Sequence, residues 1–504
     1  MEYVLTAAEM KKCDERIMTE FKVPSCVLME RAALAVYDAI DDEGLDASKS
    51  LIVCGSGNNG GDGFALARML YLDGYEPDVV LLGDKDKASE ECARQMDIFT
   101  RYGGVILTEI PEDDYTLVVD AIFGVGLSRD IGGKYYDAIG RLNNMDADKL
   151  AVDIPSGISA DNGSVMGIAF CADVTVTMAF AKYGQLLYPG REYVGELIVA
   201  DIGIDENGFD EDMQPGRYLD DNDIYSLMPK KTDSSNKGTY GKVLSVTGSI
   251  NMAGASYLSA KASYTTGCGL VYIYTPEENR VIMQTLIPEA VLCTYNEHMG
   301  PEDNLKDCLE KSSVCVLGCG LGTDSKSREI VSYILENYDK PLVIDADALN
   351  IIAKSDELKA ALEKYSHPAY ITPHMGEAKR LLKTEIDEIK KDPVKYAKEL
   401  ADTYKCVCIL KDAATVIADK KGRVYVNTSG NGGMSKGGSG DVLSGILGGV
   451  LSCGAKGPLA GALAVYLHGA AGDEAAEEAG RYGMLAEDII EGLKNVLKEI
   501  DENV

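Results

Sequence analysis

Short apolar runs alternate with helix-like sequence along most of this chain. From residue 1 to about 205, runs rich in Val, Leu and Ile are separated by helical spacing of apolar side chains, as over residues 64–72. A second series begins at residue 243 and ends in helix-like sequence from residue 442 onward. Such alternation is typical of a parallel sheet with helices on both faces. The predicted strands are residues 51–54, 79–82, 117–123, 151–154, 174–178, 197–200, 243–246, 271–274, 314–317, 342–344, 369–371, 407–410, 416–418 and 424–426.

An acidic segment separates the two series. Residues 205–223, DENGFDEDMQPGRYLDDND, contain Gly and Pro and few large aliphatic side chains. This composition is typical of a domain boundary, and 504 residues exceed what one hydrophobic core usually serves. We therefore predict an α/β protein of two domains, residues 1–215 and 222–504.

Each series contains a glycine-rich loop that carries an aspartate. GSGNNGGDGF, residues 55–64, directly follows an apolar run, and GGMSKGGSGD, residues 432–441, directly precedes a helix-like one. Glycine lets backbone N–H groups approach a ligand, and a helix N-terminus adds partial positive charge. Two such loops, each in its own strand and helix series, predict two active sites for nucleotide-like molecules.

Composition limits the partners and the compartment. The net charge is −32 and the pI is near 4.5, so the general field repels nucleic acid and acidic membrane surfaces. No apolar stretch approaches the ~18–20 residues that span a bilayer, and the N-terminal sequence does not resemble a secretory signal. Thirteen scattered cysteines without a Cys-x-x-Cys pair predict reduced, mostly buried thiols. We expect a cytoplasmic homo-oligomer with neither nucleic acid nor membrane as partner.

Three more segments of the N-terminal half end predicted strands with small or acidic residues. They are DAIFGVGLSRD (120–130), VDIPSG (152–157) and FAKYGQLLYPG (180–190). In an open parallel sheet, ligands bind beyond the carboxyl ends of the strands. Taken singly, each segment is equally well explained as a turn, a helix cap or a strand end. Taken together, they predict one crevice, whose oxygen ligands suit a hard cation. Its residues are Asn58, Asn59, Asp62, Asp120, Asp153 and Ser156.

The motifs NNGGDG, DAIFGVG and VDIPSG, with LMERAALAV at residues 28–36, resemble the YjeF N-terminal family, the epimerases of hydrated NAD(P)H. The resemblance implies a Rossmann-like three-layer sandwich and a potassium ion bound by Asn59, Asp120 and Ser156. The substrate-binding residues that it implies are Asn58, Asn59, Gly60, Gly61, Asp62, Gly124, Val125, Gly126, Leu127, Ser128, Arg129, Asp130 and Asp153.

Asp153 is our candidate for acid–base catalysis, because ring opening at the hydrated carbon needs a proton relay. Lys182 is a weaker candidate, since a surface lysine is the more ordinary interpretation.

In the C-terminal half, GGSGD opens a predicted helix. The backbone of residues 437–440 can form an anion hole, and Asp441 can accept a proton from a hydroxyl that attacks phosphate. KDAAT, residues 411–415, follows a strand and can bind an adenylate, and TPHMGE offers His374. Taken singly, His374 is more often a hydrogen-bonded structural residue, and Lys411 a solvated one.

With TGSINMAGASYLSA, LGCGLGTD and VIDADALN, these segments resemble the YjeF C-terminal family, the ADP- or ATP-dependent NAD(P)H-hydrate dehydratases of ribokinase-like α/β fold. Mg²⁺ with ADP is the implied cofactor, and the choice of ADP rests on resemblance to prokaryotic members. The resemblance implies that Ala255, Gly320, Gly322, His374 and Asp441 bind the hydrated nucleotide. It implies that Lys411, Asp412, Ala413, Ala414, Thr415 and Gly440 bind the adenine nucleotide.

Three positions depart from the commonest family pattern. Cys319 stands where proline is usual in the glycine loop, and Met375 replaces the usual proline after the histidine. Asp412 stands where glycine usually follows the lysine, which adds a negative charge near the expected phosphates. None of the three removes a group that the expected chemistry requires.

Both resemblances together imply a bifunctional enzyme that repairs hydrated NADH and NADPH (NADHX and NADPHX). The C-terminal domain would phosphorylate the new hydroxyl of the S hydrate from ADP, with Asp441 as base, and elimination would restore the ring. The N-terminal domain would interconvert the R and S hydrates, with Asp153 at its centre. One alternative is a ribokinase-like small-molecule kinase with an accessory nucleotide-binding domain. Another is a non-enzymatic nucleotide-sensing module.

Overall fold

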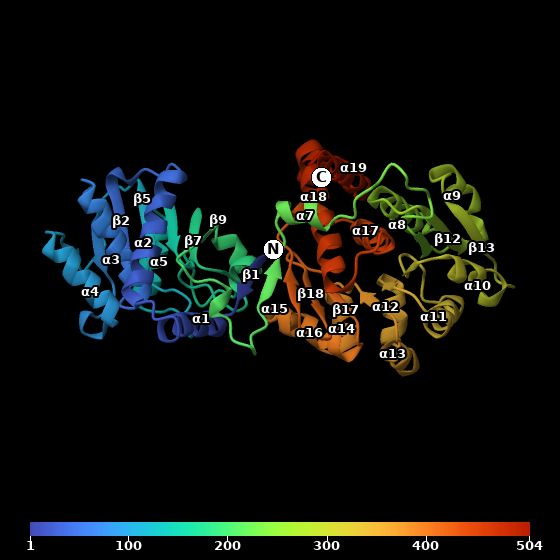
Figure 1. The fold of residues 1–504 in the computed structure, drawn as a ribbon, viewed down its shortest axis with the longest axis horizontal. Coiled ribbons are helices and arrows are strands. Elements are labelled where there is room, and N and C mark those ends of the chain that lie inside the picture. The colour runs from blue at the N-terminus through green and yellow to red at the C-terminus, as the bar shows by residue number, and fades with distance from the viewer. Residues whose placement is uncertain (504) are drawn as a thin grey trace. The chain divides into compact units, whose positions relative to one another are not determined.

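The computed structural model describes residues 1–503 and divides into two compact units. The N-terminal unit is Glu2–Pro215, and the C-terminal unit begins at Gly216 and includes Met1 (Figure 1). The division falls inside the acidic segment 205–223, part of which forms regular secondary structure. Strand β10 (Gly216–Tyr218) lies in it, and helix α7 (Asp221–Leu227) begins in it.

The N-terminal unit contains a seven-stranded parallel sheet in the order β4-β3-β2-β5-β6-β7-β9. Its strands are β2 (Ser50–Cys54), β3 (Asp78–Leu81), β4 (Ile106–Leu107), β5 (Leu117–Ala121), β6 (Asp148–Val152), β7 (Val174–Met178) and β9 (Glu196–Ala200). Its helices are α1 (Ala7–Thr19), α2 (Ser25–Asp42), α3 (Asn58–Leu72), α4 (Glu90–Arg101), α5 (Lys134–Asn143) and α6 (Tyr183–Leu186). A separate parallel pair joins β1 (Glu2–Leu5) to β8 (Ala181–Lys182).

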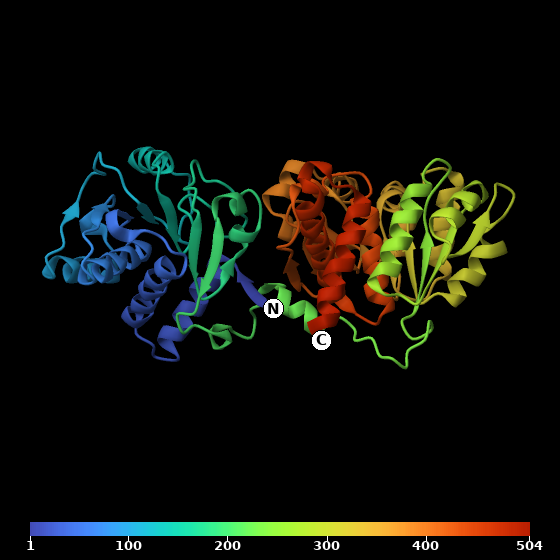
Figure 2. The same cartoon turned by 90° about the horizontal axis from the view of Figure 1, so that it is seen from above.

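Alternating side chains on these strands explain the layers of the N-terminal unit. Ile52 and Cys54 of β2 belong to the core shared with α1, α2, α3 and α4, whereas Leu51 and Val53 belong to the core under α5. This is the two-residue period of a strand that is buried on both faces. Figure 2 shows helices on both sides of this sheet. The predicted three-layer sandwich is confirmed.

The sheet of the C-terminal unit runs in the order β13-β12-β11-β14-β15-β16-β17-β18-β19-β10. It is parallel except for β18, which is antiparallel to both of its neighbours. Its further strands are β11 (Lys242–Val246), β12 (Leu270–Pro276), β13 (Val291–Tyr295), β14 (Val314–Leu317), β15 (Leu342–Ile344), β16 (Ala369–Ile371), β17 (Val407–Leu410), β18 (Val416–Asp419) and β19 (Val424–Val426).

Helices cover both faces of the C-terminal sheet. On one face α8, α17, α18 and α19 share a core with Val243 and Val316, and on the other α16 packs on β17 and β18 (Figure 1). The helices after α7 are α8 (Ala253–Thr266), α9 (Arg280–Leu286), α10 (Pro301–Lys311), α11 (Ser325–Asn337), α12 (Ala346–Ala353), α13 (Asp356–Glu363), α14 (Met375–Leu382), α15 (Ile386–Lys391), α16 (Pro393–Thr403), α17 (Ser439–Ser452), α18 (Gly457–Gly483) and α19 (Ala486–Asn503).

Every apolar run that was predicted as a strand forms one, with ends shifted by up to three residues. The run 117–123 stops as a strand at Ala121, and the run 151–154 at Val152, so that Asp153 lies in the loop beyond. The prediction missed β1, β4, β8, β10 and β13. Strands β4 and β8 have two residues each, too few for a periodic pattern.

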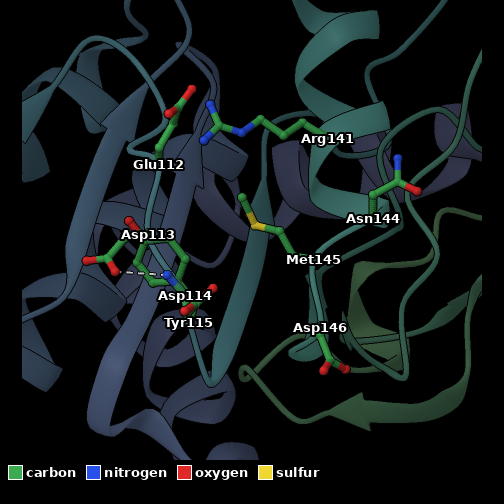
Figure 3. A pocket seen from close by; sticks show the side chains of 8 residues that line it. All are labelled: Glu112, Asp113, Asp114, Tyr115, Arg141, Asn144, Met145 and Asp146. Atoms are coloured by element: carbon green, nitrogen blue, oxygen red, sulfur yellow. Dashed lines mark hydrogen bonds between the residues drawn. The ribbon is translucent and has the colours of Figure 1, made fainter.

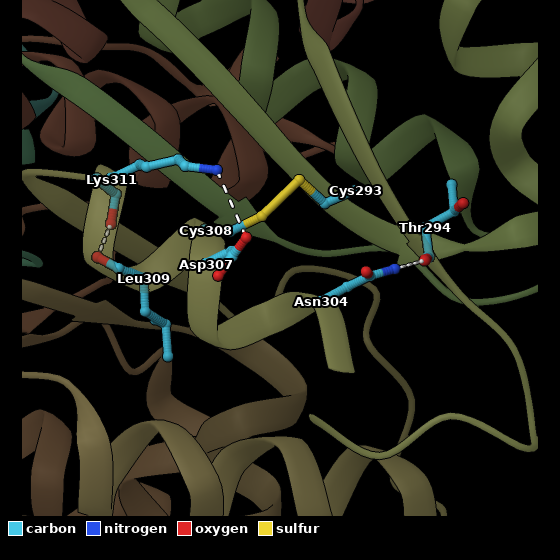
Figure 4. Close-up of a disulfide and its surroundings, with 8 residues drawn as sticks. Cys293, Thr294, Asn304, Asp307, Cys308, Leu309 and Lys311 are labelled. Carbon is cyan, nitrogen blue, oxygen red and sulfur yellow. Dashed lines mark hydrogen bonds and ion pairs between the residues drawn. A yellow bond between two sulfur atoms is a disulfide. The ribbon is translucent and has the colours of Figure 1, made fainter. Parts of the chain in front are cut away.

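A disulfide joins Cys293 of β13 to Cys308 of α10, and the prediction of reduced thiols is therefore wrong for this pair (Figure 4). The two cysteines are 15 residues apart in the sequence, and the helix packs back on the strand that precedes it. Beside them, the Asn304 side chain donates a hydrogen bond to the backbone oxygen of Thr294 at 2.9 Å. The other eleven cysteines are free thiols.

Candidate active sites

Strand order locates a crevice in each unit. In the N-terminal sheet the chain runs outward from β2 to β4 and then returns to place β5 on the other side of β2. The C-terminal sheet repeats this arrangement, with β14 on the opposite side of β11 from β12 and β13. Ligands bind beyond the carboxyl ends of strands at such a reversal. Sequence motifs lie in the loops after β2 and β5, and after β11 and β14.

Asp120, near the end of β5, and Ser156, in the loop after β6, are two of the expected potassium ligands and lie together. Oδ2 of Asp120 accepts the N–H of Ser156 at 2.7 Å, and Oδ1 accepts its hydroxyl at 2.7 Å. The same hydroxyl accepts the N–H of Phe123 at 2.8 Å. Burial raises the pKa of Asp120 to about 6, although these hydrogen bonds act in the other direction.

Asn59, the third expected ligand, is buried at the start of α3, and its side-chain nitrogen has no hydrogen-bond partner within residues 1–503. A β-carbon at Gly124, in the loop after β5, would lie 3.2 Å from its side-chain oxygen. A carboxylate, a hydroxyl and an amide around one loop are ligands that a hard monovalent cation accepts. The residues present therefore fit the expected ion by the chemistry of their donors.

Asp153 faces this crevice from the loop after β6, in a left-handed conformation with φ of 67°. Nζ of Lys182 lies 2.6 Å from its Oδ1, and the lysine side chain is only 1% exposed. The interpretation of Lys182 as a surface lysine is therefore wrong. Nζ also donates to Oγ1 of Thr177 at 2.7 Å and to the backbone oxygen of Met178 at 3.1 Å.

This pair influences two further carboxyls electrostatically. Asp62 of α3 has its pKa raised well above the usual value, first by burial and then by Asp153 and Asp14. Asp14 of α1 has its pKa raised to about 6, first by burial; Lys182 acts against the shift, and Asp153 adds to it. Asp14 lies on the buried stripe of α1, beside Met10, Cys13 and Ile17. The sequence predicted Asp62 at this site but not Asp14.

The loop after β5 is not uniformly available to a ligand. Val125 packs with a small core around Ile154, and Leu127 packs with the core under α5. Gly126, Ser128, Arg129 and Asp130 are exposed.

A cavity of about 620 Å³ lies at the opposite edge of the same sheet, near the amino ends of β5 and β6 (Figure 3). Four carboxylates line it, and its one guanidinium, that of Arg141, donates to the backbone oxygens of Ile110 and Pro111. A dominant negative charge opposes binding of a pyrophosphate. The lining residues are Glu112, Asp113, Asp114, Tyr115, Arg141, Asn144, Met145 and Asp146.

The C-terminal crevice brings Ala255 and Gly320 together, two of the residues expected to bind the substrate. A β-carbon at Gly320 would meet that of Ala255 at 2.7 Å and that of Met252 at 3.2 Å, and φ at this glycine is +59°. Only glycine fits such a close approach in this conformation. The N–H of Gly322 donates to Asp347 at 2.8 Å, which holds the loop over the start of α12.

Lys411 lies at the glycine-rich start of α17 and is paired, so its interpretation as a solvated residue is wrong. Its Nζ lies 2.8 Å from Oδ1 of Asp345, which is buried, and 3.4 Å from where a β-carbon at Gly440 would stand. The hydroxyl of Ser444 donates to the other oxygen of Asp345 at 2.7 Å. Lys411 and its hydrogen bond hold the pKa of Asp345 below its usual value despite burial. Asp412 is exposed, so water screens its extra charge.

Asp441 occupies the first turn of α17. Its pKa is raised to about 6, first by burial and then by Asp345, while Cys319 and Lys411 oppose the rise. The Cys319 thiol is buried and lies 3.8 Å from Oδ2 of Asp345, so the residue that replaces the usual proline touches the site. A carboxylate with a pKa near 6 suits a general base at neutral pH.

His374 caps helix α14 at the edge of this crevice. Its Nδ1 accepts the backbone N–H of Gly376 at 2.9 Å, and the backbone N–H of His374 donates to the Glu377 carboxylate at 2.9 Å. Burial, with Lys411 and Arg380, lowers the pKa of His374, which favours the neutral ring. Its backbone pairs with that of Lys411, so the two strand ends meet.

Comparison with known proteins assigns a family to each half of the chain. Residues 243–495 match the family described as NAD(P)H-hydrate dehydratase, and residues 25–184 match that described as YjeF-related protein N-terminus. A bifunctional NAD(P)H-hydrate repair enzyme of Moorella thermoacetica is 37% identical, over 100% of this chain and 98% of that protein. This chain belongs to the family of bifunctional NAD(P)H-hydrate repair enzymes.

Solved structures resemble the chain as well. An ADP/ATP-dependent NAD(P)H-hydrate dehydratase from Bacillus subtilis, co-crystallised with ATP and Mg²⁺, aligns with a TM-score of 0.50 at 30% identity, covering 56% of this chain and 99% of that chain. A ribokinase-like superfamily protein from Enterococcus faecalis aligns with a TM-score of 0.50 at 27% identity, covering 56% of this chain and 96% of that chain. The predicted ribokinase-like fold is confirmed.

No helix among residues 1–503 is both long enough and apolar enough to cross a bilayer.

The structure adds residues that the sequence did not single out. Asp345 and Ser444 support Lys411, and Thr177 supports Lys182. The one available signal was at Asp14, where an acidic residue falls on the apolar stripe of a helix.

Proposed function

We propose that this chain repairs hydrated NADH and NADPH with two separate active sites. The observation that carries the proposal is a carboxylate in each crevice that belongs to, or lies next to, a lysine–aspartate pair with one buried partner. In the N-terminal unit Asp153 is itself a member of the pair, and in the C-terminal unit Asp441 lies next to it. Membership of the repair-enzyme family supports the same reading.

In the N-terminal crevice, Asp153 acts as acid–base catalyst for the interconversion of R and S hydrates. The loop of residues 58–62 and that of residues 124–130 bind the hydrated nucleotide. Potassium, held by Asn59, Asp120 and Ser156, offsets the repulsion between a pyrophosphate and the local carboxylates.

In the C-terminal crevice, Asp441 takes the proton of the substrate hydroxyl as that oxygen attacks a phosphoryl group of the bound nucleotide. Hydroxide is a poor leaving group and phosphate a good one, so elimination then restores the dihydronicotinamide ring. Ala255, Gly320, Gly322 and His374 bind the hydrated substrate. Residues 411–415, with Gly440, bind ADP, and Mg²⁺ supplies charge neutralisation when the nucleotide is bound.

The enzyme works as a homo-oligomer in the cytoplasm, the compartment in which the reduced cofactors become hydrated. A stable phosphorylated product would instead favour a small-molecule kinase, the alternative that shares the C-terminal fold. The resemblance of the N-terminal unit to the YjeF family argues against that alternative.

The test is to incubate the full chain with a mixture of R and S hydrates, Mg²⁺ and either ADP or ATP. We expect complete recovery of dihydronicotinamide absorbance with ADP, and recovery of more than the S fraction shows that epimerisation takes place. No recovery with either nucleotide would refute the proposed function.

A further inference from the structure

The two carboxylate oxygens of Asp153 have different surroundings. Oδ1 receives the Lys182 ammonium at 2.6 Å, the Thr177 hydroxyl at 3.3 Å and the N–H of Met178 at 3.4 Å. Oδ2 accepts no hydrogen bond from the described residues, and it lies 3.2 Å from where a β-carbon at Gly124 would stand. One oxygen is therefore bound by the protein, and the other faces the substrate loop.

The ammonium of Lys182 has no hydrogen left for a ligand. It carries three N–H groups, and it has three acceptors, Oδ1 of Asp153, Oγ1 of Thr177 and the backbone oxygen of Met178, at 2.6, 2.7 and 3.1 Å. The side chain is 1% exposed. This geometry is that of a cation which holds a neighbour in place, and it argues against direct proton transfer from Lys182 to a bound molecule.

The backbone of both residues is fixed by the same glutamine. The Gln185 side chain donates to the backbone oxygen of Asp153 at 2.7 Å and accepts the N–H of Lys182 at 2.7 Å. Asp153 also donates its N–H to Val176 at 2.8 Å. A non-glycine residue with φ of 67° costs free energy, and it persists only where surrounding contacts hold it. These hydrogen bonds hold Asp153 in that conformation.

We propose that Lys182 is a positioning residue for epimerisation: it fixes Oδ1 of Asp153, so that Oδ2 alone exchanges a proton with the substrate. The proposal rests on the proposed epimerase function of this crevice.

The chemistry balances without a co-reactant. Oδ2 takes the proton of the ring hydroxyl, a C=O bond forms, and the bond between the hydrated carbon and the ring nitrogen breaks. The nitrogen keeps the electron pair and receives the proton from Oδ2. After the freed carbonyl turns over, the reverse steps close the ring with the hydroxyl on its other face. Lys182 keeps all of its protons throughout.

The experiment uses the full chain with mixed hydrates and saturating ADP and Mg²⁺. Absorbance then rises in a first phase, dehydration of the S hydrate, and a second phase limited by epimerisation. We expect Lys182→Met to slow the second phase about 100-fold through kcat, with KM nearly unchanged and the first phase intact. Thr177→Val, which removes one acceptor, should slow it about threefold to tenfold. Lys182→Arg keeps the charge but cannot release a proton, and should exceed Lys182→Met in activity.

Replacing a buried side chain also removes packing contacts. Chemical rescue separates this loss of packing from the loss of the positioning role. In Lys182→Ala, ethylammonium should restore part of the second phase, whereas ethanol of similar size should not. Wild-type rates for Lys182→Met, or equal rescue by ethanol, would overturn the positioning role. So would activity of a folded Lys182→Arg no greater than that of Lys182→Met. Asp153→Asn tests the proposed epimerase function separately. Full epimerase activity of this variant would mean that Asp153 is not the base, whatever the role of Lys182.

Discussion

Each unit contains a lysine–aspartate pair with one buried partner, Lys182 in the first and Asp345 in the second, but the pair stands in a different relation to the proposed base. In the N-terminal crevice the paired aspartate, Asp153, is the proposed base, and Lys182 contacts it directly. In the C-terminal crevice Lys411 pairs with Asp345, while the proposed base, Asp441, has no ion pair within 1–503 and a pKa raised to about 6.

The difference follows from the two reactions. In the proposed phosphoryl transfer, anionic phosphates would bind at the start of α17, where a lysine beside Gly440 is more useful than one on the base. In that arrangement Asp345 would hold the lysine when phosphates are absent. Ring opening brings no new anion to the reacting carbon. In the N-terminal crevice the lysine can therefore pair with the proposed base itself. A lysine–aspartate pair therefore does not by itself identify the catalytic carboxylate.

The largest effect is expected from a substitution of Asp441, which should affect one active site and not the other. Asp441→Asn should reduce ADP-dependent dehydration by ~10²–10⁴-fold, because the attacking hydroxyl loses its base, while epimerisation continues. Absorbance of restored dihydronicotinamide reports the first activity, and chromatographic separation of the R and S hydrates reports the second. Near-normal dehydration would remove Asp441 from the mechanism.

The pH profile of the wild-type dehydratase provides the control. Asp441 acts when ionised, so the rate should fall as pH drops through about 6. Lys411 opposes the raised pKa, and Lys411→Met should therefore move this acidic limb to higher pH.

The corresponding change in the other unit is Asp153→Asn. It should reduce epimerisation by ~10²–10³-fold and leave dehydration intact, because only the N-terminal base is lost. With mixed hydrates and ADP, the absorbance should rise to the S fraction and then stall, apart from slow spontaneous interconversion. Rapid and complete turnover of both epimers would contradict the assignment.

The sequence predicted the layers and the strand positions because apolar runs and glycine loops are local signals. It singled out Asp62, Asp120 and Asp153 for the same reason, since each lies in a local motif at or after the end of an apolar run. The sequence did not predict the lysine–aspartate pairs. Asp345 and Lys411 are 66 residues apart, and Ser444 is 99 residues from Asp345, so nothing local relates them.

Lys182 illustrates the limit most directly. As a type, lysine is usually exposed, and only the three-dimensional position beside Asp153 makes this one buried. The disulfide between Cys293 and Cys308 is a similar case, because the fold of β13 and α10 decides which thiols meet.

A substitution at Asp14 should have an intermediate effect, on the stability of the N-terminal unit. Its pKa is about 6 in the folded protein, above the usual 3.8, so the unfolded chain releases this proton first as pH rises. Folding then loses up to about 3 kcal/mol above pH 6, and nothing below pH 4. Asp14→Asn should remove that loss and stabilise the N-terminal unit at pH 8 but not at pH 4. Hydrogen exchange of peptides from β2 and β5 in the full chain measures the difference.

Glu15, the next residue on α1, is exposed and provides the matched control. Glu15→Gln removes the same charge from the solvent face, and its exchange should change little between the two pH values. Equal stabilisation by both variants would mean that net charge, rather than the buried position of Asp14, is responsible. If Asp14 helps epimerisation, its removal should raise stability and lower the second-phase rate together.

The smallest expected effect tests potassium in the N-terminal crevice. A chain of charge −32 has to bind a pyrophosphate beside Asp62, Asp120 and Asp153, and a cation on Asn59, Asp120 and Ser156 would reduce the repulsion. Replacing potassium by a bulky organic cation should weaken hydrate binding about tenfold, or roughly 1.4 kcal/mol. Asp120→Ala should weaken it similarly and respond little to the exchange of salt. Ionic strength has to stay constant, because general screening would otherwise give the same trend. The dehydratase of the same preparation serves as internal control, and a hydrate affinity that is equal in both salts and unaltered in Asp120→Ala would exclude the proposed ion.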